Sequence, residues 1–189
     1  YSALNPEEII VWRYSAKRRS EELARKTIDT IGELGCKCDI CIESCEIISG
    51  YIKSDSCTTI LKSAIIAMDI ENLNYEPSIN NLLHLLNRAY LENRFDPLDV
   101  EGLKPFHRSF PRSELIKTIG NLGNQETMNF IVKKLQSRED PTEVKGRKEL
   151  YKILSLLIKR KFECPENIIL VGLDDQKEIR WSSVVAIGE

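Results

Sequence analysis

The sequence predicts an all-α protein, an α-solenoid built from about four to five antiparallel helical hairpins. Two similar segments, TIGELG over residues 30–35 and TIGNLG over residues 118–123, end two helical patterns, and Ile187-Gly188 repeats part of them. Apolar residues elsewhere follow the three-four spacing of a helix face, and no segment shows convincing strand alternation. A recurring helix end is typical of stacked helical repeats, in which each hairpin covers the apolar side of the next.

Periodicity and capping residues predict four helices in the first half of the chain. Pro6 and Pro77 stand where the first and fourth begin, because proline is favoured in the first helical turn, and Gly35 ends the first. The expected helices cover residues 6–34, 39–52, 58–73 and 77–90. The expected apolar faces of the first two helices contain Leu23, Ala24, Thr27, Ile28, Ile31, Leu34, Ile42, Ile47, Ile48, Tyr51 and Ile52.

The second half begins with an interruption. Residues 93–111 contain several prolines and a glycine, which predict an irregular loop. Beyond it, helices are expected over residues 112–122, 125–135, 144–162, 165–173 and 174–189. Residues 1–189 are therefore expected to form a single unit of about nine helices.

The composition is ordinary for a globular protein: 189 residues, 42% hydrophobic, 30% charged and a formal net charge of −2. This charge neither favours nor excludes a nucleic-acid partner. No apolar run approaches the roughly 20 residues that cross a bilayer, so no membrane insertion is expected. Because amphipathic helices supply the core, the six cysteines are not needed as disulfides, and we expect a cytoplasmic protein. The chain lacks an initial Met and stops within a repeat, so we expect a piece of a longer protein with flanking domains.

Two acidic turns that lead into helices resemble the turn of HEAT repeats. They read DPTEVK over residues 140–145 and DDQKEIR over residues 174–180. Together with the Ile-Gly helix ends, they are most similar to the HEAT-like repeats named after phycobilisome lyases, over roughly residues 15–50 and 112–189. The resemblance implies hairpins in which the acidic cap of one repeat pairs with an Arg or Lys of its neighbour, giving a ladder of ion pairs. It implies no particular function, because such repeats serve many unrelated proteins.

Four cysteines lie within ten residues of each other: Cys36, Cys38, Cys41 and Cys45. Thiolates at this density are suited to zinc or, less favourably, to an iron–sulfur cluster. However, the spacing is not that of paired C-x2-C ribbon sites, and Cys41 and Cys45 share a helix face with Ile48 and Ile52. This pattern favours small buried core residues. No cofactor is therefore expected, and zinc at the cysteine cluster is the alternative.

Basic residues crowd two of the expected helices. The candidate contacts for a nucleic acid or another partner are Arg18, Arg19, Arg25, Arg147, Lys148 and Lys152. If both helices faced one side of the stack, their cations would form a groove for phosphates or for an acidic partner. Glutamates are interspersed among them, as on an ordinary solvated helix face.

No catalytic constellation is found in the sequence. The leading hypothesis is a non-enzymatic protein-interaction scaffold, or a sensing or regulatory segment of a larger intracellular protein, that presents an extended surface to a protein or peptide. A nucleic-acid-binding helical-repeat module that uses the basic faces is the first alternative. A metal or thiol module at the cysteine cluster, including chromophore-lyase-like chemistry, is the second.

Overall fold

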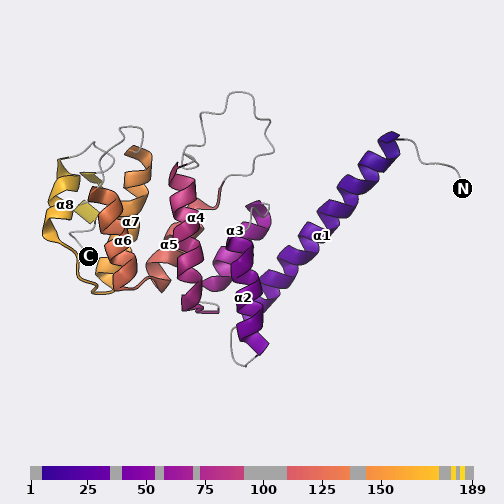
Figure 1. Ribbon diagram of the computed structural model, residues 1–189, viewed down its shortest axis with the longest axis horizontal. Coiled ribbons are helices and arrows are strands. Elements are labelled where there is room, and N and C mark those ends of the chain that lie inside the picture. The colour runs from indigo at the N-terminus through magenta and orange to yellow at the C-terminus, as the bar shows by residue number, and fades with distance from the viewer. Residues whose placement is uncertain are drawn as a thin grey trace, which may run out of the picture.

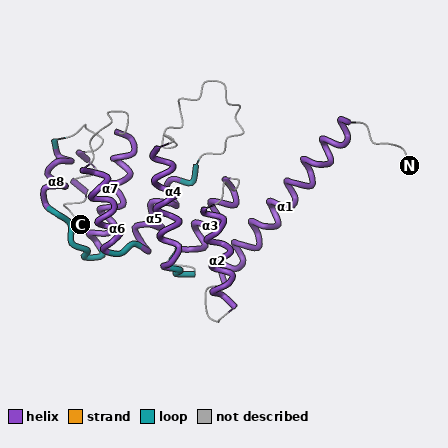
Figure 2. Tube along the Cα trace, viewed as in Figure 1, coloured by secondary structure: helices purple, strands orange, loops and turns teal. Residues whose placement is uncertain are grey.

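In a computed structural model of the chain, helices account for most of the described residues, which contain no strand (Figure 1). The structure describes residues 6–34, 40–53, 58–69, 73–91, 110–136, 144–174, 180–181 and 184–185. The helices are α1 (Pro6–Leu34), α2 (Ile40–Lys53), α3 (Thr58–Met68), the 3-10 helix η1 (Glu76–Ser78), α4 (Ile79–Leu91), α5 (Arg112–Leu122), α6 (Gln125–Gln136), α7 (Val144–Lys159) and α8 (Glu166–Leu173). The predicted all-α class is confirmed, and the described loops between helices are short (Figure 2).

The helices pack as two rows. In the odd-numbered row, α1 packs against α3, α3 against α5 and α5 against α7. In the even-numbered row, α2 packs against α4 and α6 against α8, while α2 with α3, α4 with α5 and α6 with α7 join the rows. The chain thus progresses from α1 at one end of the molecule to α8 at the other (Figure 1).

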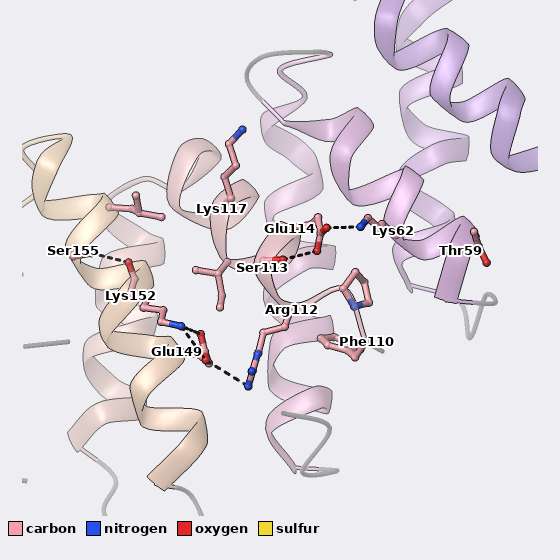
Figure 3. Close-up of a pocket in the computed structure, with 13 residues that line it drawn as sticks. Thr59, Lys62, Phe110, Arg112, Ser113, Glu114, Lys117, Glu149, Lys152 and Ser155 are labelled. Atoms are coloured by element: carbon pink, nitrogen blue, oxygen red, sulfur yellow. Dashed lines mark hydrogen bonds and ion pairs between the residues drawn. The ribbon is translucent and has the colours of Figure 1, made fainter. Parts of the chain in front are cut away.

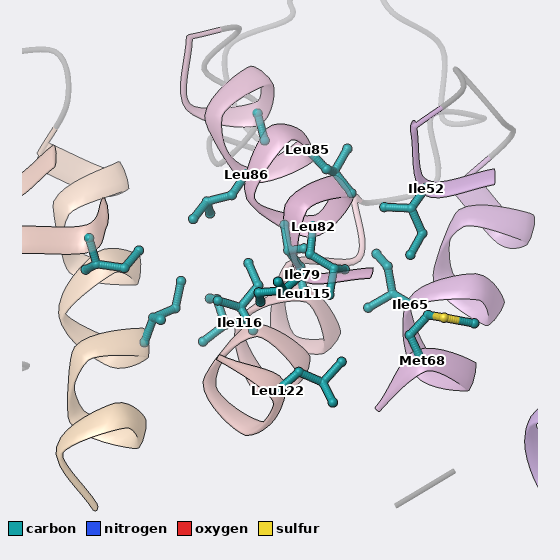
Figure 4. Close-up of a cluster of buried hydrophobic side chains, with 14 of the residues drawn as sticks. Ile52, Ile65, Met68, Ile79, Leu82, Leu85, Leu86, Leu115, Ile116 and Leu122 are labelled. Atoms are coloured by element: carbon teal, nitrogen blue, oxygen red, sulfur yellow. The ribbon is translucent and has the colours of Figure 1, made fainter. Parts of the chain in front are cut away.

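Buried apolar side chains fill the space between the two rows. Figure 4 shows the middle of this core, where Ile65 of α3 points toward Leu82 of α4 and Leu115 of α5. The buried positions of α4 recur at the spacing expected of one helix face: Leu82, Leu85, Leu86 and Ala89. Each fully buried Leu or Ile contributes about 1.5–3 kcal/mol, so packing between helices stabilises this fold more than helix propensity does.

The recurring glycine marks a close crossing between neighbours of the odd-numbered row. Gly32, in the last turn of α1, has little room for a side chain, since a Cβ there would lie 3.1 Å from Cβ of Ala67 on α3. Gly120, in the last turn of α5, lies even closer to α7, and its Cβ would lie 2.4 Å from Cδ1 of Leu156. Gly188, in the third copy, lies outside the described residues.

Helix α3 ends at Met68, five residues before the predicted end at Leu73. The carbonyls of Ala67 and Met68 accept hydrogen bonds from the amides of Leu73 and Tyr75, at 3.1 and 3.4 Å, and this closes the last turn. Asn74 has φ 48°, a left-handed conformation that asparagine tolerates better than most residues. The chain therefore reverses direction here although the apolar pattern continues.

Asp69, which directly follows α3, is buried and links α3 to α5. Its Oδ1 accepts a hydrogen bond from Nδ2 of Asn121 at 2.9 Å, and its Oδ2 accepts one from Oγ1 of Thr118 at 3.2 Å. A buried carboxylate is stable only when such donors replace water. The link fixes the end of α3 against α5.

Helix α7 ends at Lys159, three residues before the predicted end at Phe162. Lys161 has φ 65°, and its amide donates to the carbonyl of Ile158 at 2.7 Å, while the amide of Phe162 donates to that of Leu157 at 3.2 Å. These two bonds form a Schellman motif, in which glycine is the usual left-handed residue. Because a lysine occupies that position, the sequence carries no recognisable stop.

Part of the apolar face predicted for the first two helices is exposed. Leu23 and Leu34 of α1 are 68% and 72% exposed, and Ile42 and Ile47 of α2 are exposed as well, so their predicted burial was wrong. Among the described residues, α1 packs mainly on α3, through side chains such as Ile28. A helix at the end of a row has a neighbour on one side only, so apolar residues on its other side stay uncovered.

Several predictions fall on residues that the structure does not describe. The expected loop over residues 93–111 lies outside the described residues except for Phe110 and Pro111, which are not helical. The acidic turn over residues 140–143 is also outside them. Of the helix expected over residues 174–189, the described residues 180–181 and 184–185 are helical.

Candidate functional site

A groove of about 840 Å³ crosses α3, α5 and α7, three successive helices of the odd-numbered row (Figure 3). Thr59 and Lys62 of α3 line one side, and Glu149 and Lys152 of α7 line the other. Helix α5, with the two residues before it, lies between these sides. The volume lies within the range of about 300–1,000 Å³ that is typical of ligand sites.

Polar and apolar groups both line this groove. Nine of its thirteen residues carry charged or hydroxyl side chains. The apolar lining consists of Phe110, Pro111, Ile116 and Leu156. This mixed composition suits a ligand that presents both charged or polar groups and apolar surface.

An ion pair between Lys62 and Glu114 joins α3 to α5 within the groove. Nζ of Lys62 lies 2.6 Å from Oε1 of Glu114, and Oγ of Ser113 donates a hydrogen bond to Oε2 at 2.9 Å. Burial raises the pKa of Glu114, but hydrogen bonds from Lys62, from its own amide and from Ser113 outweigh burial and lower the pKa below 4.5. The carboxylate is therefore held ionised at the start of α5, where the helix dipole also favours a negative charge.

This lowered pKa predicts a stability that depends on pH. A carboxyl group with a lower pKa in the folded chain stabilises the fold above its unfolded pKa, and the effect is lost as the pH falls through the folded value. Glu114→Gln should therefore lower the free energy of unfolding by about 0.2–1 kcal/mol at neutral pH and by much less at about pH 3. Melting temperatures of wild type and variant at both pH values measure this. Glu126→Gln, at an exposed position in the first turn of α6, is the control. If Glu114→Gln lost the same stability at both pH values, the lowered pKa of Glu114 would be contradicted.

Glu149 is a buried carboxylate between two cations on the opposite side of the groove. Its side chain is 3% exposed, and Arg112 NH1 lies 3.5 Å from its Oε1. Nζ of Lys152 donates to Oε1 at 3.2 Å and lies 3.0 Å from Oε2. A buried negative charge requires such compensation, so Glu149 holds the head groups of Arg112 and Lys152 at the groove and joins α5 to α7.

The groove carries an excess of positive charge. Among the described residues that line it, four are cationic and two are carboxylates: Lys62, Arg112, Lys117 and Lys152 against Glu114 and Glu149. Both carboxylates are already engaged by cations (Figure 3). The surface is therefore complementary to a negatively charged ligand.

The ladder of ion pairs that the HEAT resemblance implied stays a prediction. That resemblance placed the ladder at the acidic turns over residues 140–143 and 174–177, and most of these residues lie outside the described part of the chain. In the groove, Lys62 pairs with Glu114 and Arg112 with Glu149, and all four residues belong to helices. These two ion pairs join successive helices of the odd-numbered row.

The structure separates the two predicted sets of cations. Of the predicted residues, Lys152 lines the groove. On the same helix, Arg147 and Lys148 are half-buried and lie outside the groove lining. The other three are on α1, where Arg18 and Arg19 are exposed, while NH1 of Arg25 lies 2.7 Å from Oδ2 of Asp29. Helices α3 and α5 lie between α1 and α7 in the row, so the two sets of cations are on helices that do not neighbour each other.

The cysteine cluster is described only in part. Cys45 is fully buried in α2 and belongs to the hydrophobic core, as its helix face predicted. Cys36 and Cys38 lie outside the described residues, and of Cys41 only the backbone, within α2, is described. Within the described part of the chain, no three His, Cys, Asp or Glu side chains are placed to hold a metal ion.

Sequence reasoning missed most of the groove residues. Lys62, Arg112, Glu114 and Glu149 looked like ordinary solvated charges within amphipathic helices. Glu149 did carry a signal, because it lies four residues before Ile153 and therefore on or beside the apolar face of its helix. A charge at that position predicts a buried carboxylate that needs a cation, and the lysine three residues later supplies one.

Comparison with known proteins adds no family to this description: no protein-family model, curated protein or solved structure matches the chain. The similarity to HEAT repeats therefore remains a prediction from the residues themselves. Among the described residues, no helix combines the length and the apolar character that crossing a bilayer requires.

Proposed function

We propose that the chain is an α-solenoid of HEAT-like hairpins that works as a protein-interaction module and binds a segment of a partner protein in the groove across α3, α5 and α7. Two observations support the solenoid. Each helix of the odd-numbered row packs on the next, and glycines at equivalent positions of α1 and α5 mark two of these crossings. Stacked repeats of this kind present extended surfaces to their partners.

The groove is the observation that carries the proposal. It crosses three successive helices, so a ligand that fills it contacts elements far apart in the sequence. Its lining supplies charged groups on both sides and apolar surface between them, which together suit a peptide better than a small apolar molecule. The described residues that line it include no His or Cys, and Oγ of Ser155 donates to the backbone carbonyl of Lys152 at 2.9 Å. These features favour binding over catalysis.

Selection from a displayed library of random peptides of about twelve residues tests the proposal. Peptides enriched on the immobilised chain would be labelled with a fluorophore, and their affinities measured by fluorescence anisotropy. Ser113→Trp, at an exposed position of the groove lining, places a bulky ring in the groove. Asn129→Trp, at an exposed position of α6, is the matched control.

We expect enriched peptides to bind wild type and Asn129→Trp alike and to bind Ser113→Trp at least about tenfold more weakly. Far-UV circular dichroism would verify that both variants fold as wild type does. If no peptide is enriched over the bare support, or if the enriched peptides bind Ser113→Trp as well as wild type, the groove is not an interaction site and the proposed function fails.

A further inference from the structure

We propose that the partner segment bound in the groove is acidic and also carries an apolar side chain. This inference rests on the proposed function and names the chemistry of the ligand at the same site. The carboxylates of the segment lie against one lysine from each helix, Lys62 of α3, Lys117 of α5 and Lys152 of α7. Its apolar side chain lies over Ile116 and Leu156.

The positions of the lysines support an acidic ligand. The side chains of Lys62 and Lys152 are 52% and 46% exposed, so solvent and a ligand can reach both. Each pairs with a carboxylate of the groove, but an ammonium group has three donors, and one partner does not exhaust them. A ligand carboxylate can therefore join either lysine without displacing Glu114 or Glu149. A basic segment would instead have to break these existing pairs.

The apolar lining supports a mixed segment over a purely acidic one. Ile116 is buried, and Leu156 and Phe110 are half-buried at the groove. An apolar side chain that covers them removes this surface from water, and the hydrophobic effect then adds to charge complementarity. Because ion pairs at partly exposed sites are individually weak, the apolar contact is needed for useful affinity.

A nucleic-acid strand fits the same surface less well. A strand carries a phosphate at every nucleotide, so some phosphates would have to lie beside Glu114, Glu149 or the apolar lining, whereas a peptide can place a few carboxylates at the lysines and an apolar side chain between them. Arg18 and Arg19, which would extend a phosphate-binding track, lie on α1 and not in the groove. The observations therefore favour a peptide, and nucleic-acid binding becomes an outcome that the experiment can reveal.

Three displayed peptide libraries test the inference directly. All have about twelve residues with random apolar and polar positions, and they differ only at four fixed positions. These positions hold Asp or Glu in the first library, Asn or Gln in the second, and Lys or Arg in the third. The readout is the number of peptides whose binding is abolished by Ser113→Trp. We expect the acidic library to yield about tenfold more of these peptides than either of the other two libraries. A single-stranded and a double-stranded DNA oligonucleotide are measured in parallel.

Two charge-matched double variants assign the preference to the groove. Lys62→Gln with Lys117→Gln removes two groove charges, and Lys53→Gln with Lys133→Gln removes two from exposed positions of α2 and α6. We expect the first pair of substitutions to lower the affinity for the best acidic peptide about tenfold and the second pair to change this affinity little. Lys152 stays unchanged because it compensates the buried Glu149, so the test does not depend on that ion pair.

Raising the salt concentration from about 0.05 to 0.5 M should lower the affinity for the acidic peptide. We expect this loss to be larger for wild type than for the variant with Lys62→Gln and Lys117→Gln. The inference fails if the neutral or basic library dominates, if both double variants bind equally, or if DNA binds through the groove more tightly than any peptide. If groove-dependent peptides appear that are not acidic, the proposed function stands and the inference alone is wrong. If no peptide depends on the groove, both fail.

Discussion

Ile119→Asp is expected to unfold the helical core in a single step. Ile119 begins the last turn of α5 and is completely buried. Removing an isoleucine side chain from a core costs about 2–5 kcal/mol, and a carboxylate left there without a partner adds to that cost. Because domains are stable by only about 5–15 kcal/mol, this single substitution removes most of the available stability.

Far-UV circular dichroism during urea titration measures the effect. We expect wild type to show a cooperative transition and Ile119→Asp to show a transition at much lower urea, or no folded baseline at all. Asn129→Asp introduces the same carboxylate at an exposed position of α6 and should leave the midpoint nearly unchanged. A midpoint for Ile119→Asp equal to that of wild type would contradict the burial of this face of α5.

The sequence predicted the helices best where local signals suffice. The structure begins α5 at Arg112 and α6 at Gln125, as predicted, and the apolar spacing in both identifies the buried face. The ends of α3 and α7 were missed for different reasons. Asp69 after α3 takes its partners from α5, which no local pattern reveals, and Lys161 after α7 adopts a conformation typical of glycine.

The candidate site was harder to predict than the fold. Lys152 was singled out because cations crowd its helix, but Lys62 and Glu114 carry no unusual local pattern. Their pairing depends on α3 and α5 being neighbours in the odd-numbered row, which is a property of the packing. Arg18 and Arg19 illustrate the converse, since a basic run on α1 looked similar in sequence and lies outside the groove.

Gly120→Ala is expected to destabilise the fold although alanine is the better helix former. A Cβ at residue 120 would lie 2.4 Å from Cδ1 and 2.6 Å from Cβ of Leu156. A new rotamer can move Cδ1 away, but Cβ of Leu156 is fixed to the backbone, so α7 itself has to shift. Overpacking of this kind costs about 1–3 kcal/mol, which exceeds the roughly 1 kcal/mol that helix propensity returns. The recurring glycine of the sequence is thus a consequence of how closely successive helices of one row cross.

Two other glycines turn this prediction into an ordered series. Gly50 is exposed on α2 with nothing within 4 Å of the added Cβ, so Gly50→Ala should stabilise the fold by up to about 1 kcal/mol. The change in stability for Gly32→Ala should lie between those of the other two variants. Its Cβ would lie 3.1 Å from Cβ and 3.2 Å from Cα of Ala67, which is a tight contact, and these atoms can move only together with α3. Urea midpoints of the three variants measure the order. Stabilisation by Gly120→Ala equal to that by Gly50→Ala would mean that α5 and α7 do not cross at this glycine, and the explanation of the repeated Ile-Gly ends would have to be abandoned.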